Sequence, residues 1–160
     1  MKQEDLLLID LCSRLYYKVK VSLIYNNEEY KGTLCAIYPE DNRVIIDDLN
    51  KSCHYYNQTC GGFLIDENKV KPYLFPLSSM TEEQFLELTE LCNMYDNYHD
   101  YNPYEYWGIQ VCRKHIHGNK PCFSNNYKAI DWFNKNHFDY RGLIPMGLAI
   151  DATELNIYES

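Results

Sequence analysis

The sequence predicts an α+β protein, in which a small β-barrel follows an N-terminal helix and precedes a mainly helical C-terminal half. Two patterns predict this fold class. Short alternating or β-branched segments, separated by Asn, Gly and Pro turns, fill residues 18–71, and apolar residues recur at helical spacing on either side. With 160 residues, 46% of them hydrophobic and 24% charged, the chain has an ordinary globular composition. We therefore expect one compact body.

The first segment, residues 1–17, is predicted to hold a helix over 3–15. Apolar residues recur from Leu6 to Leu15 at helical spacing, and two acidic residues precede them, where they favour the helix dipole. The longest apolar run here is only four residues, followed by Asp10, and no basic region precedes it, which argues against a signal peptide. No stretch of the sequence approaches the roughly 20 apolar residues of a membrane span. We expect a soluble, cytoplasmic protein with no membrane partner.

Five short strands are predicted between residues 18 and 71. The first alternates apolar and polar side chains and ends at Asn26, and the second contains Gly32. The five segments cover residues 19–25, 30–38, 43–47, 62–65 and 69–71. So many short strands, one of them interrupted by glycine, predict a five-stranded SH3-like or Sm-like barrel. An open sheet of two hairpins, covered by the first helix, is the alternative.

The C-terminal half, residues 81–160, follows an extended linker at 72–80 that contains two prolines. Thr81 and Gln84 have the spacing of a capping box, which predicts a helix from 82 to about 95. Its apolar residues share one face, and its acidic residues lie mainly on the other: Glu82, Glu83, Glu87 and Glu90. A second helix is predicted over 127–136, and short turns are predicted after it.

The formal net charge of −8 is unevenly distributed along the chain. Residues 81–106 carry seven acidic side chains and no Lys or Arg, whereas residues 107–141 carry six basic side chains against two acidic ones. This distribution predicts an electrically polarised molecule, with an acidic surface for a basic partner or a basic strip for an anionic ligand. Pairing of the two blocks within the molecule is the alternative.

The seven cysteines are an odd set scattered over predicted helices and strands, which favours reduced thiols over a disulfide framework. Cys12, Cys35 and Cys92 lie within apolar periodic segments. We therefore expect these three residues to be small buried hydrophobic side chains.

Several motifs together resemble a known group of proteins. They are Asp10–Leu15 near the start, Lys71–Gln84 with its sequence KPYLFPLSSMTEEQ, Trp132–Ile144 with its HFDYRGLI end, and Gly147–Ala152. They resemble a family of small uncharacterised proteins encoded by phages and prophages of Bacteroides-type gut bacteria. The resemblance implies a phage-associated setting in the cytoplasm of a bacterial host and no particular reaction. Residues 53–62 and 96–126 depart from it and resemble insertions, where we expect specificity to lie.

The insertion at 96–126 and the residue before it carry the candidate binding residues. Tyrosines recur every third residue beside acids, and a basic strip follows: Tyr95, Asp96, Tyr98, Asp100, Tyr101, Tyr104, Glu105, Arg113, Lys114, His115, His117 and Lys120. Our leading hypothesis is a non-catalytic phage accessory protein that binds a host protein or complex through segment 95–106. The alternative is a counter-defence protein that sequesters a small nucleotide signal, because aromatic rings stack on bases and basic groups neutralise phosphates. The acids argue against long nucleic acid, and packing of the tyrosines against the barrel remains open.

A metal site is a second alternative in the same insertion. Cys112, His115, His117 and Cys122 have the side-chain types that zinc prefers, but their spacing matches no common zinc module. On a strand, the two histidines would share a face and Cys112 would point to the other face. We therefore favour no metal and no cofactor. Because the common nucleotide-binding and catalytic motifs are absent, we predict that the chain is not an enzyme.

Near the C-terminus, Asp139, Tyr140 and Arg141 precede a glycine. An Asp and an Arg beside a glycine turn most often hydrogen-bond to backbone groups and fix the turn. We expect that role here, with a functional trio as the alternative.

Overall fold

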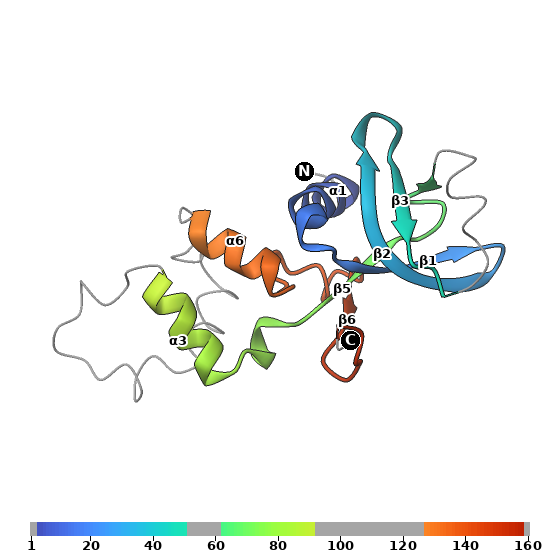
Figure 1. The fold of residues 1–160 in the computed structure, drawn as a ribbon. Helices are drawn as coiled ribbons and strands as arrows, with labels where there is room; N and C mark the ends of the chain where they lie inside the picture. Colours follow the sequence, from blue (N-terminus) through green and yellow to red (C-terminus); the bar gives the residue numbers. More distant parts are fainter. Residues whose placement is uncertain (1–2, 51–61, 92–126, 159–160) are drawn as a thin grey trace, which may run out of the picture. The chain divides into compact units, whose positions relative to one another are not determined.

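A computed structural model of the chain describes residues 3–50, 62–91 and 127–158. These residues form an α+β fold with three α-helices and an open, mixed, six-stranded sheet (Figure 1). The chain divides into two compact units. The first, here called the sheet unit, comprises Met1–Leu74 and Arg141–Ser160, and the second, the helical unit, comprises Phe75–Tyr140.

The sheet unit begins with helix α1, Gln3–Arg14, which continues into a 3-10 turn, η1, over Leu15–Tyr17. Lys18 ends this turn in the left-handed conformation, with φ of 53°, and its N–H donates to the Leu15 carbonyl. The prediction of a helix over 3–15 is confirmed. Strand β1 begins two residues later.

The sheet consists of β1 (Lys20–Tyr25), β2 (Glu28–Tyr38), β3 (Arg43–Asp47), β4 (Phe63–Leu64), β5 (Lys71–Leu74) and β6 (Ile150–Asp151). The strand order is β4-β3-β2-β1-β5-β6. All pairs are antiparallel except β5 with β6, which is parallel. Asn26 and Asn27 join β1 to β2 with positive φ angles of 51° and 64°, as a two-residue hairpin requires.

The predicted five-stranded barrel is wrong in two respects, because the sheet is open and has a sixth strand. Strand β4 is only two residues long and pairs with β3, so it forms one edge of the described sheet. At the other edge β5 pairs with β6, which lies far along the chain. Strand β2 does curve strongly (Figure 1), with a bulge between Leu34 and Ala36 and with Gly32 packed closely on β3. The curvature expected from the glycine is present without closure.

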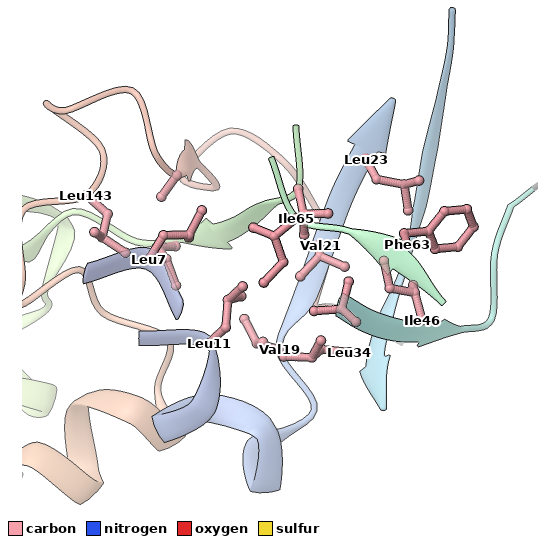
Figure 2. Packing of buried hydrophobic residues seen from close by; sticks show 14 residues of the cluster. Leu7, Leu11, Val19, Val21, Leu23, Leu34, Ile46, Phe63, Ile65 and Leu143 are labelled. Carbon is pink, nitrogen blue, oxygen red and sulfur yellow. The ribbon is translucent and has the colours of Figure 1, made fainter. Parts of the chain in front are cut away.

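One hydrophobic core holds the sheet unit together. Leu7 and Leu11 of α1 contribute to the same cluster as Val21 and Leu23 of β1 (Figure 2). Leu143 and Ala149 join this cluster from the C-terminal part of the chain. Burying each large apolar side chain contributes about 1.5–3 kcal/mol. The sheet unit therefore depends on segments from both ends of the sequence.

The helical unit contains η3 (Leu77–Ser79), α3 (Glu82–Leu91) and α6 (Tyr127–Lys135). Its core comprises Leu77, Met80, Phe85, Leu88, Ala129, Trp132, Phe133 and Phe138. The Trp132 ring stacks on Phe138 with centroids 5.5 Å apart and planes 6° apart. The helices predicted from 82 and over 127–136 are confirmed as far as the structure describes them. None of the described helices is long and apolar enough to span a membrane.

Candidate functional site

The predicted binding and metal residues all lie between 92 and 126, outside the described residues. The Tyr-rich acidic segment 95–106, the basic strip 113–120 and the Cys/His set therefore stay predictions. Cys92 lies in the same range. The structure does describe helix α3 before this range and helix α6 after it. It also describes every residue of β1, β2 and β5.

Helix α3 leads directly into the Tyr-rich segment. Its capping box is formed as predicted: the Thr81 N–H donates to Gln84 Oε1 at 2.9 Å, and the Gln84 N–H donates to Thr81 Oγ1 at 3.2 Å. Phe85 and Leu88 are buried in the core of the helical unit. The start of α3 is thus fixed by local hydrogen bonds, and its inward face is fixed by packing in the core of the helical unit.

The outward face of α3 is acidic. Glu82, Glu83, Glu87 and Glu90 are all exposed. None of these carboxylates forms an ion pair with a cation of the described residues. Glu83 and Glu87 are four residues apart, and like charges at this spacing on a helix destabilise it by about 0.2–0.5 kcal/mol. A cationic partner bound along this face would relieve that repulsion.

A second group of functional side chains lies on the sheet, on the face opposite the core. Val21 and Leu23 of β1 point into the core, so the alternate residues Lys20 and Ser22 point to the other face. Ser22 pairs with Lys31 of β2 on one side and with Lys71 of β5 on the other. Residues directly opposite in an antiparallel pair share a face. Three lysines therefore surround Ser22 on the outer face of the sheet.

Hydrogen bonds and a ring contact confirm this placement. Lys20 Nζ donates to Thr33 Oγ1 at 2.8 Å, across the β1–β2 pair. Lys31 Nζ lies 5.8 Å from the centroid of the buried Tyr73 ring, a cation–π distance. The alternation along β1 predicts a strand but gives these lysines no role. The register that brings Lys71 beside them joins residues about fifty positions apart, so spacing alone gives no signal of it.

Two carboxylates lie on the same face. Glu29 accepts a hydrogen bond of 2.8 Å from Ser22 Oγ, and it lies two residues before Lys31 on β2. Asp47 is paired with Thr33 across the β2–β3 ladder. A hydrogen bond with the Asp47 carboxylate, together with some burial and nearby negative charge, raises the pKa of the Cys35 thiol. The Glu29 carboxylate thus lies at Ser22, in the middle of the three lysines, and Ser22 itself is only 5% exposed.

The described cysteines differ from the prediction that they are buried. Cys12 and Cys35 are both exposed free thiols. Cys12 follows Leu11 on α1 and so faces away from the core, and Cys35 is the extra residue at the β2 bulge. Burial raises the pKa of Cys12 as well, so neither thiol is activated as a thiolate. Among the described residues no cluster of three or more His, Cys, Asp or Glu side chains has the arrangement of a metal site.

Buried polar contacts tie the C-terminal segment to α1 and the sheet. Asp10 and Arg14 are fully buried, with Arg14 Nε 2.7 Å from Asp10 Oδ2, and Arg141 Nε lies 3.2 Å from Asp10 Oδ1. The Tyr158 hydroxyl accepts a hydrogen bond from the Lys20 N–H at 3.2 Å and donates one to the Tyr73 carbonyl at 2.7 Å. Arg141, which was predicted to fix a turn together with Asp139, thus forms an ion pair with Asp10 of α1. We assign these contacts to stability.

No protein-family model, no curated protein and no solved structure matches this chain.

Proposed function

We propose that this chain is a non-catalytic binding protein that uses an acidic surface of its helical unit to hold a basic protein partner. The surface comprises the outward face of α3 and the Tyr-rich segment 95–106 that follows it. In the phage-associated setting implied by the sequence resemblance, the partner is a host protein or complex.

The exposed carboxylates of α3 are the observation that carries this proposal. They lie on one face, opposite Phe85 and Leu88, and no cation of the described residues neutralises them. The next three acids along the chain, Asp96, Asp100 and Glu105, extend the same run of negative charge. Complementary charge accelerates association and selects partners of the opposite sign. The tyrosines supply large contact area at low entropic cost, as in many binding surfaces.

Quantitative capture with two charge-reversal variants tests the proposal. One variant combines Asp96→Lys, Asp100→Lys and Glu105→Lys, and the other combines Glu83→Lys, Glu87→Lys and Glu90→Lys. Tagged wild type and variants are incubated with bacterial lysate, and captured proteins are quantified by mass spectrometry. Both variants should lose the same specific partner, and wild-type capture of that partner should fall as salt is raised.

A matched control distinguishes a local effect from a change in net charge. It combines Asp41→Lys, Glu67→Lys and Glu154→Lys, which are exposed acids of the sheet unit and change the charge by the same amount. This control should keep the partner. Equal capture by all four proteins would refute the acidic surface. If the control lost the partner to the same extent as the two variants, net charge alone would explain the binding.

A further inference from the structure

We propose that the outward face of α1 binds a second copy of this chain, through an antiparallel contact between the two α1 helices. This face, here called the outer stripe of α1, is defined by Asp5, Ile9, Cys12 and Tyr16, the last of which lies in η1. It belongs to the sheet unit and takes no residue from the acidic surface proposed above. The two proposals therefore concern different partners.

The residues of the outer stripe lie on one side of the helix, opposite the core. Asp5, Ile9 and Cys12 follow one another at intervals of four and three residues, and Tyr16 comes four residues later. Side chains at this spacing share one face of a helix. All four residues are exposed, whereas Leu11 points from the other side of α1 into the core of the sheet unit (Figure 2).

The polarity of α1 is the reverse of that expected for a surface helix. On the outer stripe Ile9 is 43% exposed and Tyr16 is 87% exposed. The charged residues Asp10 and Arg14 are instead fully buried. A surface helix presents polar side chains to water, and a helix that is apolar on both sides is covered on both sides. The outward face of α3 follows this rule with its carboxylates, so the apolar outer stripe of α1 indicates a partner.

The charges at the two ends of the outer stripe favour a second copy in antiparallel orientation. Asp5 precedes Cys12, and the exposed Lys18 follows it, each at about 10 Å along the axis. In an antiparallel pair centred on Cys12, Asp5 of each copy comes opposite Lys18 of the other, and Ile9 comes beside Tyr16. A parallel pair would place Asp5 against Asp5. A twofold axis at Cys12 therefore makes the outer stripe complementary to itself.

Sedimentation equilibrium of the full chain under reducing conditions, over a series of concentrations, tests self-association. The contact is small, so the wild type should form a weak, reversible dimer. A variant with Ile9→Glu and Tyr16→Glu places like charges opposite each other and should dimerise at least about tenfold more weakly. The matched control combines Ile24→Glu and Tyr127→Glu, at positions outside α1 that are 39% and 75% exposed, and should dimerise like wild type. Circular dichroism and melting curves verify that each variant folds.

A charge exchange tests the antiparallel orientation. Asp5→Lys sets two lysines against each other at both ends of the contact, and it should weaken the dimer by about threefold or more. Adding Lys18→Asp restores opposite charges at both ends and should recover the affinity of wild type. No recovery in the double variant would contradict the antiparallel orientation.

Cross-linking tests whether α1 forms the contact, because Cys12 lies at its centre. Cys12 and Cys35 are both exposed thiols with raised pKa values, so they serve as matched probes. Two variants retain either Cys12 or Cys35, with the other six cysteines replaced by serine, and both are treated with a short bismaleimide. The variant that retains Cys12 should form covalent dimers much faster than the variant that retains Cys35.

Three outcomes would overturn self-association through α1. The first is a wild type that stays monomeric at every concentration, and the second is equal dimerisation by the Ile9 and Tyr16 variant and its control. The third is equal cross-linking through Cys12 and Cys35. If Cys12 became linked to another protein in bacterial lysate while the purified chain stayed monomeric, the outer stripe would belong to that protein instead. None of these results bears on capture of a basic protein by the acidic surface, so the two proposals fail separately.

Discussion

The two units differ in the kind of contact that joins their distant segments. In the sheet unit, Asp10 of α1 pairs with Arg141, and Tyr158 bonds Lys20 and Tyr73. In the helical unit, backbone hydrogen bonds join Phe75 to His137 and Asp139, and an apolar cluster packs α3 against α6, while the start of α3 is held by a local capping box. Polar substitutions should therefore disturb the whole sheet unit, whereas substitution in the cap of α3 should act locally.

The largest effect is expected from Asp10→Asn. This change removes the buried carboxylate that pairs with Arg14 Nε and Arg141 Nε, and removing one partner of a buried ion pair costs about 3–5 kcal/mol. The free energy of unfolding, measured by urea denaturation, should fall by that amount. Glu154→Gln removes the same charge at an exposed position and should change it by less than about 0.5 kcal/mol. A small effect of Asp10→Asn would mean that the ion pair contributes little to the sheet unit.

Matched leucine truncations compare the two cores directly. Leu23 and Leu88 are both 0% exposed, one in each unit. Leu23→Ala and Leu88→Ala should each cost about 2–5 kcal/mol. Hydrogen exchange measured by mass spectrometry should rise in α1, the sheet and β6 for the first, but only within 75–91 and 127–140, among the described residues, for the second. Faster exchange everywhere in both variants would show that the units unfold as one.

Tyr158→Phe should have an intermediate effect. The hydroxyl satisfies one backbone donor and one backbone acceptor, and its loss leaves buried polar groups unpaired, at a cost of about 1–3 kcal/mol. Amide exchange of Lys20 should increase more than that of Leu23. Tyr127→Phe, at a residue that is 75% exposed, is the matched control and should be neutral.

The same hydroxyl predicts a pH dependence. Burial raises the pKa of Tyr158 above its ordinary value of 10.0, so the folded chain holds this proton more tightly than the unfolded chain. The contribution of the protonated hydroxyl to the free energy of unfolding is fully present below pH 10 and is lost as the pH rises beyond that value. Between pH 10 and about pH 11, the free energy of unfolding of wild type should fall by up to about 1.4 kcal/mol more than that of Tyr158→Phe. Parallel stability curves for the two proteins would contradict this assignment.

The smallest effect is expected from the capping box of the helical unit. Thr81→Ala removes the acceptor for the Gln84 N–H and should cost about 1 kcal/mol. Serine at the same position retains the hydroxyl, so Thr81→Ser should recover most of the loss. Hydrogen exchange should increase in the first turn of α3 and remain unchanged in the sheet. A change that reached the sheet unit would contradict the local character of this region.

The sequence predicted best the features that local chemistry decides. Thr81 and Gln84 define the start of α3 because both hydrogen bonds form within one turn. Asn26 and Asn27 end β1 because asparagine tolerates positive φ. Strands β1 to β3 match the predicted alternating, glycine-containing and β-branched segments. Strand β5 was predicted over 69–71 but covers Lys71–Leu74, so most of it lies in the segment predicted as an extended linker, and β6 was not predicted. Strand β6 has only two residues, which are too few to show an alternation of apolar and polar side chains. They form a strand because they pair with β5.

The remaining differences arise from tertiary contacts. A glycine in β2 predicted curvature, but closure of a barrel depends on which strands form the edges, and β6 occupies one of them. Cys35 lies in an apolar segment yet is exposed, because a bulge shifts the alternation at that residue. The lysine group was missed for a related reason: Lys71 joins it only through the pairing of β5 with β1. The candidate residues between 95 and 122 remain predictions.

The Tyr158 hydroxyl also sets an order of events during synthesis on the ribosome. It joins β1 to β5 at a point where its partner Lys20 was made 138 residues earlier. Strands β1 to β3 can form their hairpins as they emerge, because their pairings are close in sequence. The β1–β5 seam acquires its last hydrogen bonds only after residue 158 has emerged. A nascent chain that has reached β5 but not yet Tyr158 therefore carries an incompletely bonded sheet, which a chaperone or a neighbouring strand can contact.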